Sequence, residues 1–128
     1  MSTLTVSNVS DGSLSIPTTY VTNGSAKAWV NFNGTGTVAT RDSLNVSSLT
    51  DNGTGDYTIN FTSSLANGNY TSTHMVAQLD ADGAGTGSVD WLIYYSQTTA
   101  ALRVTAGNGA STSADMFYVA LSVNGDLA

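Results

Sequence analysis

The chain has 128 residues, with 9 acidic and 3 basic side chains, no cysteine and a net charge of −6. This length predicts one domain with a hydrophobic core that needs no disulfides. So few basic groups argue against nucleic-acid binding, and no stretch approaches the roughly 20 apolar residues of a membrane span.

The composition favours strands over helices. Serine, threonine, asparagine and glycine make up nearly half of the chain, and glutamate is absent. These residues either compete for backbone hydrogen bonds or lose entropy in a helix, so we expect no helix. Asn-Gly and Asp-Gly pairs, which suit tight hairpin turns, recur along the chain. They begin at Asp11, Asn23, Asn33, Asn52, Asn67, Asp82, Asn108 and Asn124.

Alternation of apolar and polar residues marks the strands between these turns. The runs 57–61 and 117–123 alternate without a break, as expected of strands with one buried face. With the other candidates they predict an all-β, single-domain fold, an antiparallel β-sandwich of the jelly-roll type. In chain order, the predicted strands are 4–9, 28–32, 44–49, 57–61, 70–79, 89–95, 101–105 and 117–123.

The two ends of the chain differ in their expected roles. We expect residues 1–20 to form an N-terminal arm or first strand, and residues 21–128 to form the sandwich. The first residues lack the basic and apolar pattern of a secretory leader. Strands with so few lysines lack the charges that discourage edge pairing, so we expect the protein to associate with copies of itself.

Catalytic chemistry has few candidates. His74 is the only histidine, and no serine lies in a nucleophile-elbow motif. Most aspartates sit beside glycine or asparagine in turns, where a solvated role is expected. The sequence therefore predicts no enzyme, no catalytic residue and no cofactor.

The segment 80–88 has part of the pattern of a calcium loop. Asp80 and Asp82 provide the first oxygen ligands, but alanine and tryptophan stand at positions 5 and 12. The third oxygen side chain and the bidentate glutamate are therefore missing. We expect a glycine-rich hairpin here, with Asp80 and Asp82 as weak candidates for metal binding.

Three aromatic residues are candidates for an interface or for a sugar platform. Trp29 is out of phase with the apolar residues around it, and Tyr70 and Tyr94 lie on predicted strands. Aromatics at such positions pack against the core or a neighbouring subunit, or they stack on the apolar face of a sugar.

The segments 26–38 (AKAWVNFNGTGTV), 41–49 (RDSLNVSSL) and 51–61 (DNGTGDYTINF) carry a more specific signal. Together they resemble bacteriophage virion appendage domains, which recur in tail-fibre and related virion proteins of marine phages and cyanophages. The resemblance covers residues 21–61 closely and 75–77 loosely. It brings no catalytic motif.

This resemblance implies a β-module, usually trimeric, exposed on an appendage or a capsid. Because only about twenty residues precede the recognisable segment, we expect no fibre shaft. We expect a homotrimeric capsid decoration, knob or short fibre protein, attached through its arm or trimer base to a major capsid or tail protein. It would be assembled into virions in the host cytoplasm. The alternative is a receptor-binding tail-fibre tip that recognises host surface polysaccharide.

Charged residues within the motif have a structural interpretation. Arg41, Asp42 and Asp56 are among only 12 charged side chains. An ion pair between Arg41 and a nearby aspartate, Asp42 or Asp56 among them, would hold loops in register.

Overall fold

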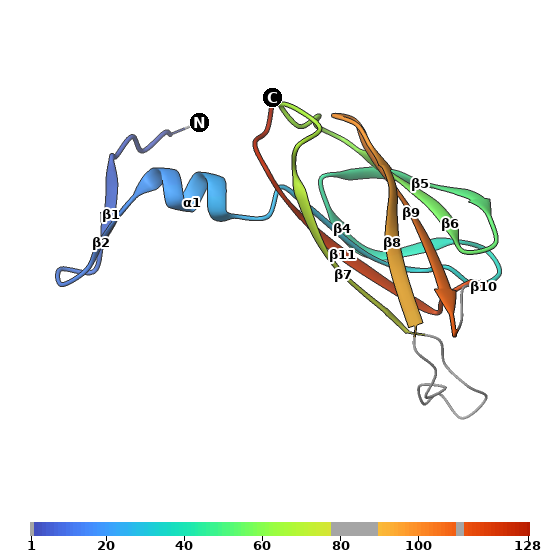
Figure 1. Cartoon of the computed structure of the whole chain (residues 1–128). Helices are drawn as coiled ribbons and strands as arrows, with labels where there is room; N and C mark the ends of the chain where they lie inside the picture. Colours follow the sequence, from blue (N-terminus) through green and yellow to red (C-terminus); the bar gives the residue numbers. More distant parts are fainter. Residues whose placement is uncertain (1, 78–89, 110–111) are drawn as a thin grey trace.

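The computed structural model describes residues 2–77, 90–109 and 112–128, which form two facing antiparallel sheets and an N-terminal arm (Figure 1). The predicted all-β sandwich is confirmed. Within these residues the elements are β1 (Asn8–Ser10), β2 (Ser15–Pro17), α1 (Thr18–Gly24), β3 (Ala28–Asn33), β4 (Ala39–Leu44), β5 (Val46–Gly53), β6 (Asp56–Phe61), β7 (Thr71–Ala77), β8 (Asp90–Gln97), β9 (Ala101–Asn108), β10 (Thr112–Ser113) and β11 (Tyr118–Asn124).

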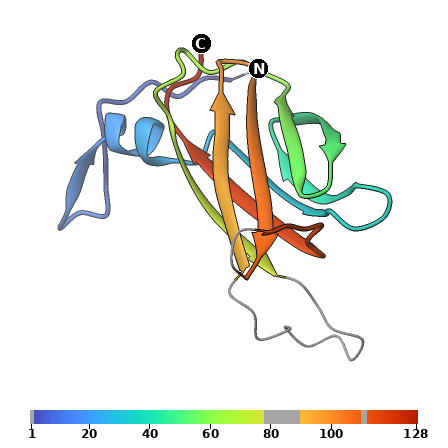
Figure 2. The ribbon, with the colours of Figure 1, turned by 45° about the vertical axis from the view of Figure 1, so that its right-hand side comes forward.

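Each sheet combines strands that are distant in sequence. Sheet I has the strand order β4-β3-β11-β7, so the last strand of the chain pairs with β3 and β7. In sheet II, β9 pairs with β8, β6 and the short β10, and β5 pairs with the other edge of β6. Figure 2 shows β8 and β9 side by side on one layer, with β7 and β11 behind them.

The core lies between the sheets and is built by alternation. Every second residue of β3, β6, β9 and β11 is buried, and the residues between them face outward. β6 and β11 contain the two runs that alternate without a break in the sequence. Their buried side chains are Ala28, Val30, Phe32, Tyr57, Ile59, Phe61, Leu102, Val104, Ala106, Val119, Leu121 and Val123.

The predicted strand 44–49 is wrong, because the chain changes sheet within it. β4 ends at Leu44 in sheet I, and β5 begins at Val46 in sheet II. Asn45 stands between them with a φ of 56°, a left-handed conformation that breaks the extended backbone. The single predicted strand is therefore two strands joined by a corner.

The N-terminal arm extends away from the sandwich (Figures 1 and 2). It consists of the β1–β2 hairpin and α1, and it ends at Gly24, a few residues beyond the predicted boundary. The expectation of no helix is wrong for residues 18–24. Pro17, with a φ of −58° and a ψ of 140°, stands at the N-cap and provides no side-chain capping hydrogen bond, so the helix begins directly after the proline.

Candidate functional site

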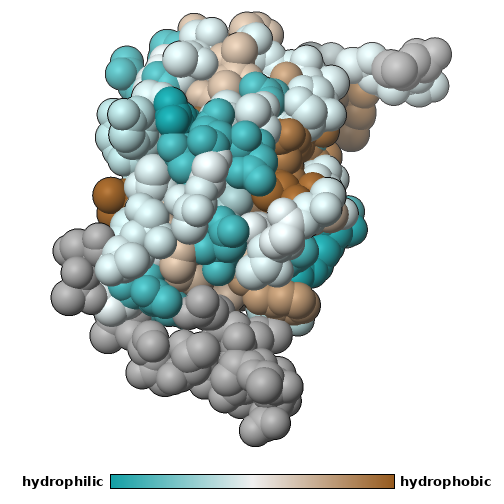
Figure 3. All heavy atoms as spheres, turned by 90° about the vertical axis from the view of Figure 1, so that its right-hand side faces the viewer, coloured by the Kyte–Doolittle hydropathy of each residue, from teal (hydrophilic) through white to brown (hydrophobic). Residues whose placement is uncertain are grey.

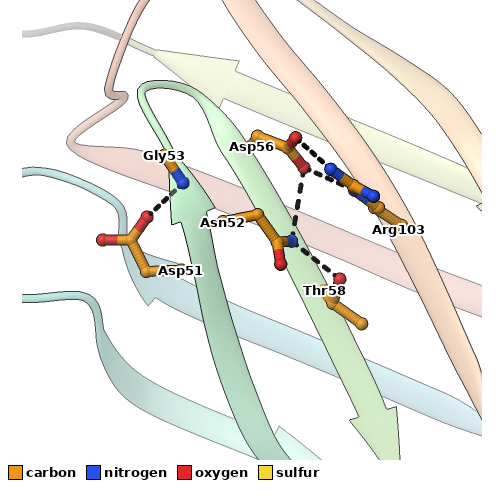
Figure 4. Close-up of polar contacts among 6 residues, drawn as sticks. All are labelled: Asp51, Asn52, Gly53, Asp56, Thr58 and Arg103. Atoms are coloured by element: carbon orange, nitrogen blue, oxygen red, sulfur yellow. Dashed lines mark hydrogen bonds and ion pairs between the residues drawn. The ribbon is translucent and has the colours of Figure 1, made fainter.

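A network of polar side chains crosses the outer face of sheet II (Figure 4). Asp56 on β6 and Arg103 on β9 form a bidentate ion pair. The arginine Nε donates to Oδ1 of the carboxylate at 2.8 Å, and Nη2 donates to Oδ2 at 2.6 Å. The strand register places Arg103 opposite Thr58, two residues from Asp56 on the same face, so the pair crosses the strands diagonally. Parallel charged hydrogen bonds of this kind fix both position and orientation.

The network continues into β5 on one side and β8 on the other. The Asn52 amide donates to the Asp56 carboxylate at 3.3 Å and to the Thr58 hydroxyl at 2.8 Å. On the opposite side, the Arg103 guanidinium lies 4.5 Å from the centre of the Tyr95 ring. One connected set of contacts therefore spans β5, β6, β9 and β8.

Electrostatics in this network favour the charged forms. The hydrogen bonds from Arg103 hold the pKa of the Asp56 carboxyl below its usual value, and the Arg103 charge and the Asn52 amide add to the effect. Asp56 in turn raises the pKa of the Arg103 guanidinium. A carboxylate held ionised in this way is a poor proton donor or acceptor near neutral pH. The arrangement is suited to joining strands.

A second polar cluster joins the two sheets at the β5–β6 turn. Asp115 accepts a hydrogen bond from the Gly55 amide at 2.7 Å, and the Tyr57 hydroxyl lies 3.2 Å from the same Asp115 oxygen and 3.0 Å from the Gly34 carbonyl oxygen. Burial, together with the Asp115 charge, raises the pKa of Tyr57 well above the ordinary value. This hydroxyl therefore stays protonated and ties the two sheets together.

The predicted ion pair of Arg41 with Asp42 or Asp56 is wrong. Arg41 donates to the Asn31 side chain at 3.2 Å and to the Phe117 carbonyl at 2.7 Å. Its guanidinium also lies over two aromatic rings, 4.7 Å from Phe117 and 4.4 Å from Tyr118. The irregular register of β3 and β4 at Asn31/Phe32 leaves Arg41 out of the strand pairing. Asp56 pairs instead with Arg103, which the sequence reading missed.

The three candidate aromatics lie in three different environments. Tyr70 is buried, its hydroxyl lies 3.0 Å from the Ala101 carbonyl, and burial raises its pKa to about 12. Of the alternatives given for Tyr70, the structure shows packing in the core rather than at a sugar-binding surface. Trp29 is half-buried on the outer face of sheet I, while Tyr94 on β8 is 60% exposed. The structure does not bring these residues together at one site.

Trp29 lines an open hollow on the outer face of sheet I. The hollow has a volume of about 500 Å³ and crosses β3, β11 and β7. Met75 and Ala120, which are direct neighbours in the strand register, form its apolar floor. None of the residues that line it is an aspartate, a lysine or an arginine. The lining does include His74, the only histidine of the chain.

The side of the molecule that carries the β5–β6 hairpin has a different character. Figure 3 shows this side, on which most residues are coloured from white to teal, meaning neutral to hydrophilic. On β8, at the far edge of sheet II, Ile93, Tyr94 and Tyr95 are all more than half exposed. Exposure of three consecutive large side chains was not apparent from the sequence, because residues 89–95 have large apolar or aromatic side chains on both faces, which indicated a strand covered on both sides.

The described residues contain no group of three or more histidine, aspartate or glutamate side chains arranged to hold a metal ion. The calcium-loop candidates, Asp80 and Asp82, lie outside the described residues. Within the described part of the chain, no helix has the length and apolarity needed to cross a membrane. No protein-family model, no curated protein and no solved structure matches this chain.

Proposed function

We propose that the protein is a non-enzymatic structural component of a bacteriophage virion, a homotrimeric capsid decoration, knob or short fibre protein. The observation that carries this proposal is the N-terminal arm, which presents large apolar side chains to solvent outside a complete sandwich core. Exposed apolar surface of this kind belongs to proteins that assemble. The sequence resemblance over residues 21–61 supplies the virion setting.

The use of the basic residues supports a role as a building block. Arg103 and Arg41 each link strands of one sheet, as described above. The Lys27 ammonium group donates to the Thr22 and Ser25 carbonyls, at the junction of arm and sandwich. Each of the three basic side chains thus stabilises the fold through internal contacts. This use of the basic residues suits a rigid unit that is repeated on a particle surface.

Immunogold labelling tests this proposal directly. An antibody raised against the purified chain should label particles of the phage that encodes it at regular positions on the head or on the tail. Native mass spectrometry of the purified protein should give three times the mass of one chain. Unlabelled particles, with the chain detected only in the lysate of infected cells, would contradict the virion role.

Recognition of host surface polysaccharide is a second candidate function, favoured by Tyr94 and Tyr95. Both side chains are about 60% exposed on an edge strand, and Tyr95 contacts Arg103 of the polar network that includes Asn52, Asp56 and Thr58. Such residues supply a stacking surface and hydrogen bonds for sugar hydroxyls.

Purified lipopolysaccharide and capsular polysaccharide of the host provide the test for this second function. Binding measured by calorimetry should be lost in Tyr95→Ala and retained in Met75→Ala, since Met75 is equally exposed but lies on the other sheet. Absence of binding by the unaltered chain, or equal losses in the two variants, would remove this candidate.

A further inference from the structure

The arm exposes an unusual concentration of apolar side chains. Of the large hydrophobic side chains that are exposed in the described residues, seven lie between residues 2 and 24. None of the core residues comes from this segment, and α1 has no buried residue. The seven are Leu4, Val6, Val9, Leu14, Ile16, Tyr20 and Val21.

The arm is too small to hold its shape alone in water. Its hairpin has three residues in each strand, and its helix has 7 residues. An isolated two-stranded hairpin and a helix of this length are both marginal in water, because neither buries enough surface to offset the lost chain entropy. The arm therefore needs a surface to lie against.

The hairpin presents one apolar face. Val9 and Ile16 are direct neighbours in the register of β1 and β2, so their side chains lie on the same face. With Leu14, and with Ser10 and Asp11 beside the turn, they line a shallow depression of about 210 Å³. Ser10 and Ser15, the adjacent pair in the register, alternate to the opposite face. One face of the two strands thus carries the apolar pair, with Asp11 at its turn end, and the other face carries the serine pair.

A matching surface exists on the same chain. The hollow on sheet I has an apolar floor around Trp29, Met75 and Ala120, and none of its lining residues belongs to the arm. The arm meets the sandwich through hydrogen bonds at its base, where the Asn124 amide donates to the Gly24 carbonyl at 3.2 Å. The hollow therefore stays open to the arm of another molecule.

Charge does not oppose a second copy as the partner at these two surfaces. Every copy carries a net charge of −6, so any contact between copies must avoid bringing aspartates together. Asp11 is the one charged side chain in residues 2–24, and no carboxylate lines the hollow. Residues 2–24 also match the roughly 20–30 residues per side of a standard interface.

We propose that the arm of one copy docks with its Val9/Ile16 face on the sheet I hollow of a second copy. This inference rests on the self-association contained in the proposed function, and it names the two surfaces that associate. The contact is heterologous, since two different patches meet, and repeated contacts of this kind close into a ring if the rotation between copies allows it. Three copies in the ring give the proposed trimer.

Engineered disulfides test the contact in the full-length protein. Because the chain has no cysteine, Ile16→Cys in one tagged copy and Met75→Cys in a differently tagged copy can react only with each other or with themselves. We expect a disulfide-linked product that carries both tags. The matched control is Ser15→Cys with Met75→Cys, which moves the thiol to the polar face of the hairpin. Equal yields from the two pairs would overturn the proposal.

Complementation distinguishes arm-to-hollow docking from a bundle of arms. Val9→Thr with Ile16→Thr should raise the dissociation constant roughly 100-fold, since two apolar contacts are lost while strand propensity is kept. Met75→Lys should weaken association to a similar extent, and Tyr94→Lys, at an equally exposed position, should not. A mixture of the arm variant and the Met75→Lys variant should form heterodimers, because one competent arm still meets one intact hollow.

Each outcome bears on the inference separately from the virion role. Failure of the mixed variants to associate, or normal association of Met75→Lys, would show that the hollow is not the receiving surface. Circular dichroism and thermal melting at low concentration, unchanged in all variants, exclude misfolding as the cause. Labelled virions with no cross-linked product would overturn the docking and leave the virion role standing, whereas cross-linked protein with unlabelled virions would do the reverse.

Discussion

Asn45 determines where the chain leaves one sheet for the other. Its φ of 56° is the only positive value at a non-glycine position in the described residues. Its side-chain Nδ2 donates to the backbone carbonyls of Lys27 at 3.0 Å and Ser63 at 3.1 Å. Its side-chain Oδ1 accepts from the backbone N–H of Ser63 at 2.7 Å. Asparagine combines tolerance of this backbone conformation with the side chain needed to join three segments.

Two substitutions at Asn45 separate these contributions. Asn45→Gly keeps the backbone conformation but removes the three hydrogen bonds, so we expect it to lower the free energy of unfolding by about 2 kcal/mol. Asn45→Ala adds the strain of a left-handed alanine and should cost about 1 kcal/mol more. Urea denaturation of both variants measures the difference. Equal stability of the two would show that the backbone conformation at residue 45 contributes no strain.

The Asp56–Arg103 pair predicts a specific dependence of stability on pH. The pKa of Asp56 is lowered in the folded chain, mainly by the hydrogen bonds from Arg103. The pair therefore stabilises the fold above the ordinary carboxyl pKa, and this contribution is lost as the pH falls through the lowered value. We expect Asp56→Asn to have a lower urea midpoint than the unaltered chain at pH 7, and the difference to shrink as the pH is lowered below the ordinary carboxyl pKa.

Arg103→Gln provides the partner variant for this measurement. It should reproduce the loss at pH 7, and the double variant should be no less stable than either single one, because the pair is removed only once. Independent, additive losses would indicate that Asp56 and Arg103 act through other contacts, such as Asn52 or Tyr95.

At the scale of elements, the β5–β6 hairpin is fixed by its close approach to β9. Gly55 has a φ of 67°, and a Cβ placed on it would lie 2.4 Å from the Ala106 carbonyl oxygen. The Ala106 amide donates to the Gly55 carbonyl at 2.7 Å, so this contact is part of the sheet. Gly36 has nearly the same φ, 62°, but nothing lies within 4 Å of its Cβ position.

This contrast provides a matched pair of variants. Gly36→Ala should lower the free energy of unfolding by about 1–2 kcal/mol, because it adds only the strain of a left-handed alanine. Gly55→Ala adds the same strain, and its Cβ also forces the hairpin away from β9. We therefore expect it to lower the free energy of unfolding by about 2 kcal/mol more than Gly36→Ala does. Thermal or urea unfolding compares the two. A similar loss in both would show that the hairpin shifts without cost.

The strands that could be predicted are those with a single buried face. Alternation located β3, β6 and β11 almost to the residue, because burial on one side imposes a period of two. The corner at Asn45 could not be found in this way, since residues on both sides of it have strand-like sequences. Helix α1 was missed because its residues are poor helix formers, and its position after Pro17 was the only local signal.

Contacts between strands that are far apart in the chain could not be predicted from the sequence. Asp56 and Arg103 both stand at outward positions of strands with a buried face, but their meeting depends on the register of β6 and β9. The sequence predicted an ion pair between Arg41 and an aspartate, because opposite charge was the only basis in the sequence for choosing a partner. The actual partners of Arg41, Asn31, Phe117 and Tyr118, are brought together by β3 and β11 in sheet I.

At the scale of the whole molecule, we expect the sandwich to determine folding and the arm to determine association. Every residue of the hydrophobic core lies between Ala28 and Val123, so the sandwich buries its apolar surface without the arm. The arm in turn exposes most of its apolar surface. Removal of the arm should therefore affect association far more than folding.

A chain of residues 25–128 tests this division. We expect it to unfold cooperatively in urea with a midpoint that does not change between 1 and 100 µM protein, because the folded state no longer binds copies of itself. The midpoint of the full chain should rise over the same range, since association stabilises the folded state by mass action. The two midpoints should converge at the lowest concentration, where both chains are monomers with the same core. A truncated chain that is unfolded at every concentration would mean that the arm is needed for the sandwich itself, and a concentration-dependent midpoint in the truncated chain would place the association on surfaces other than the arm.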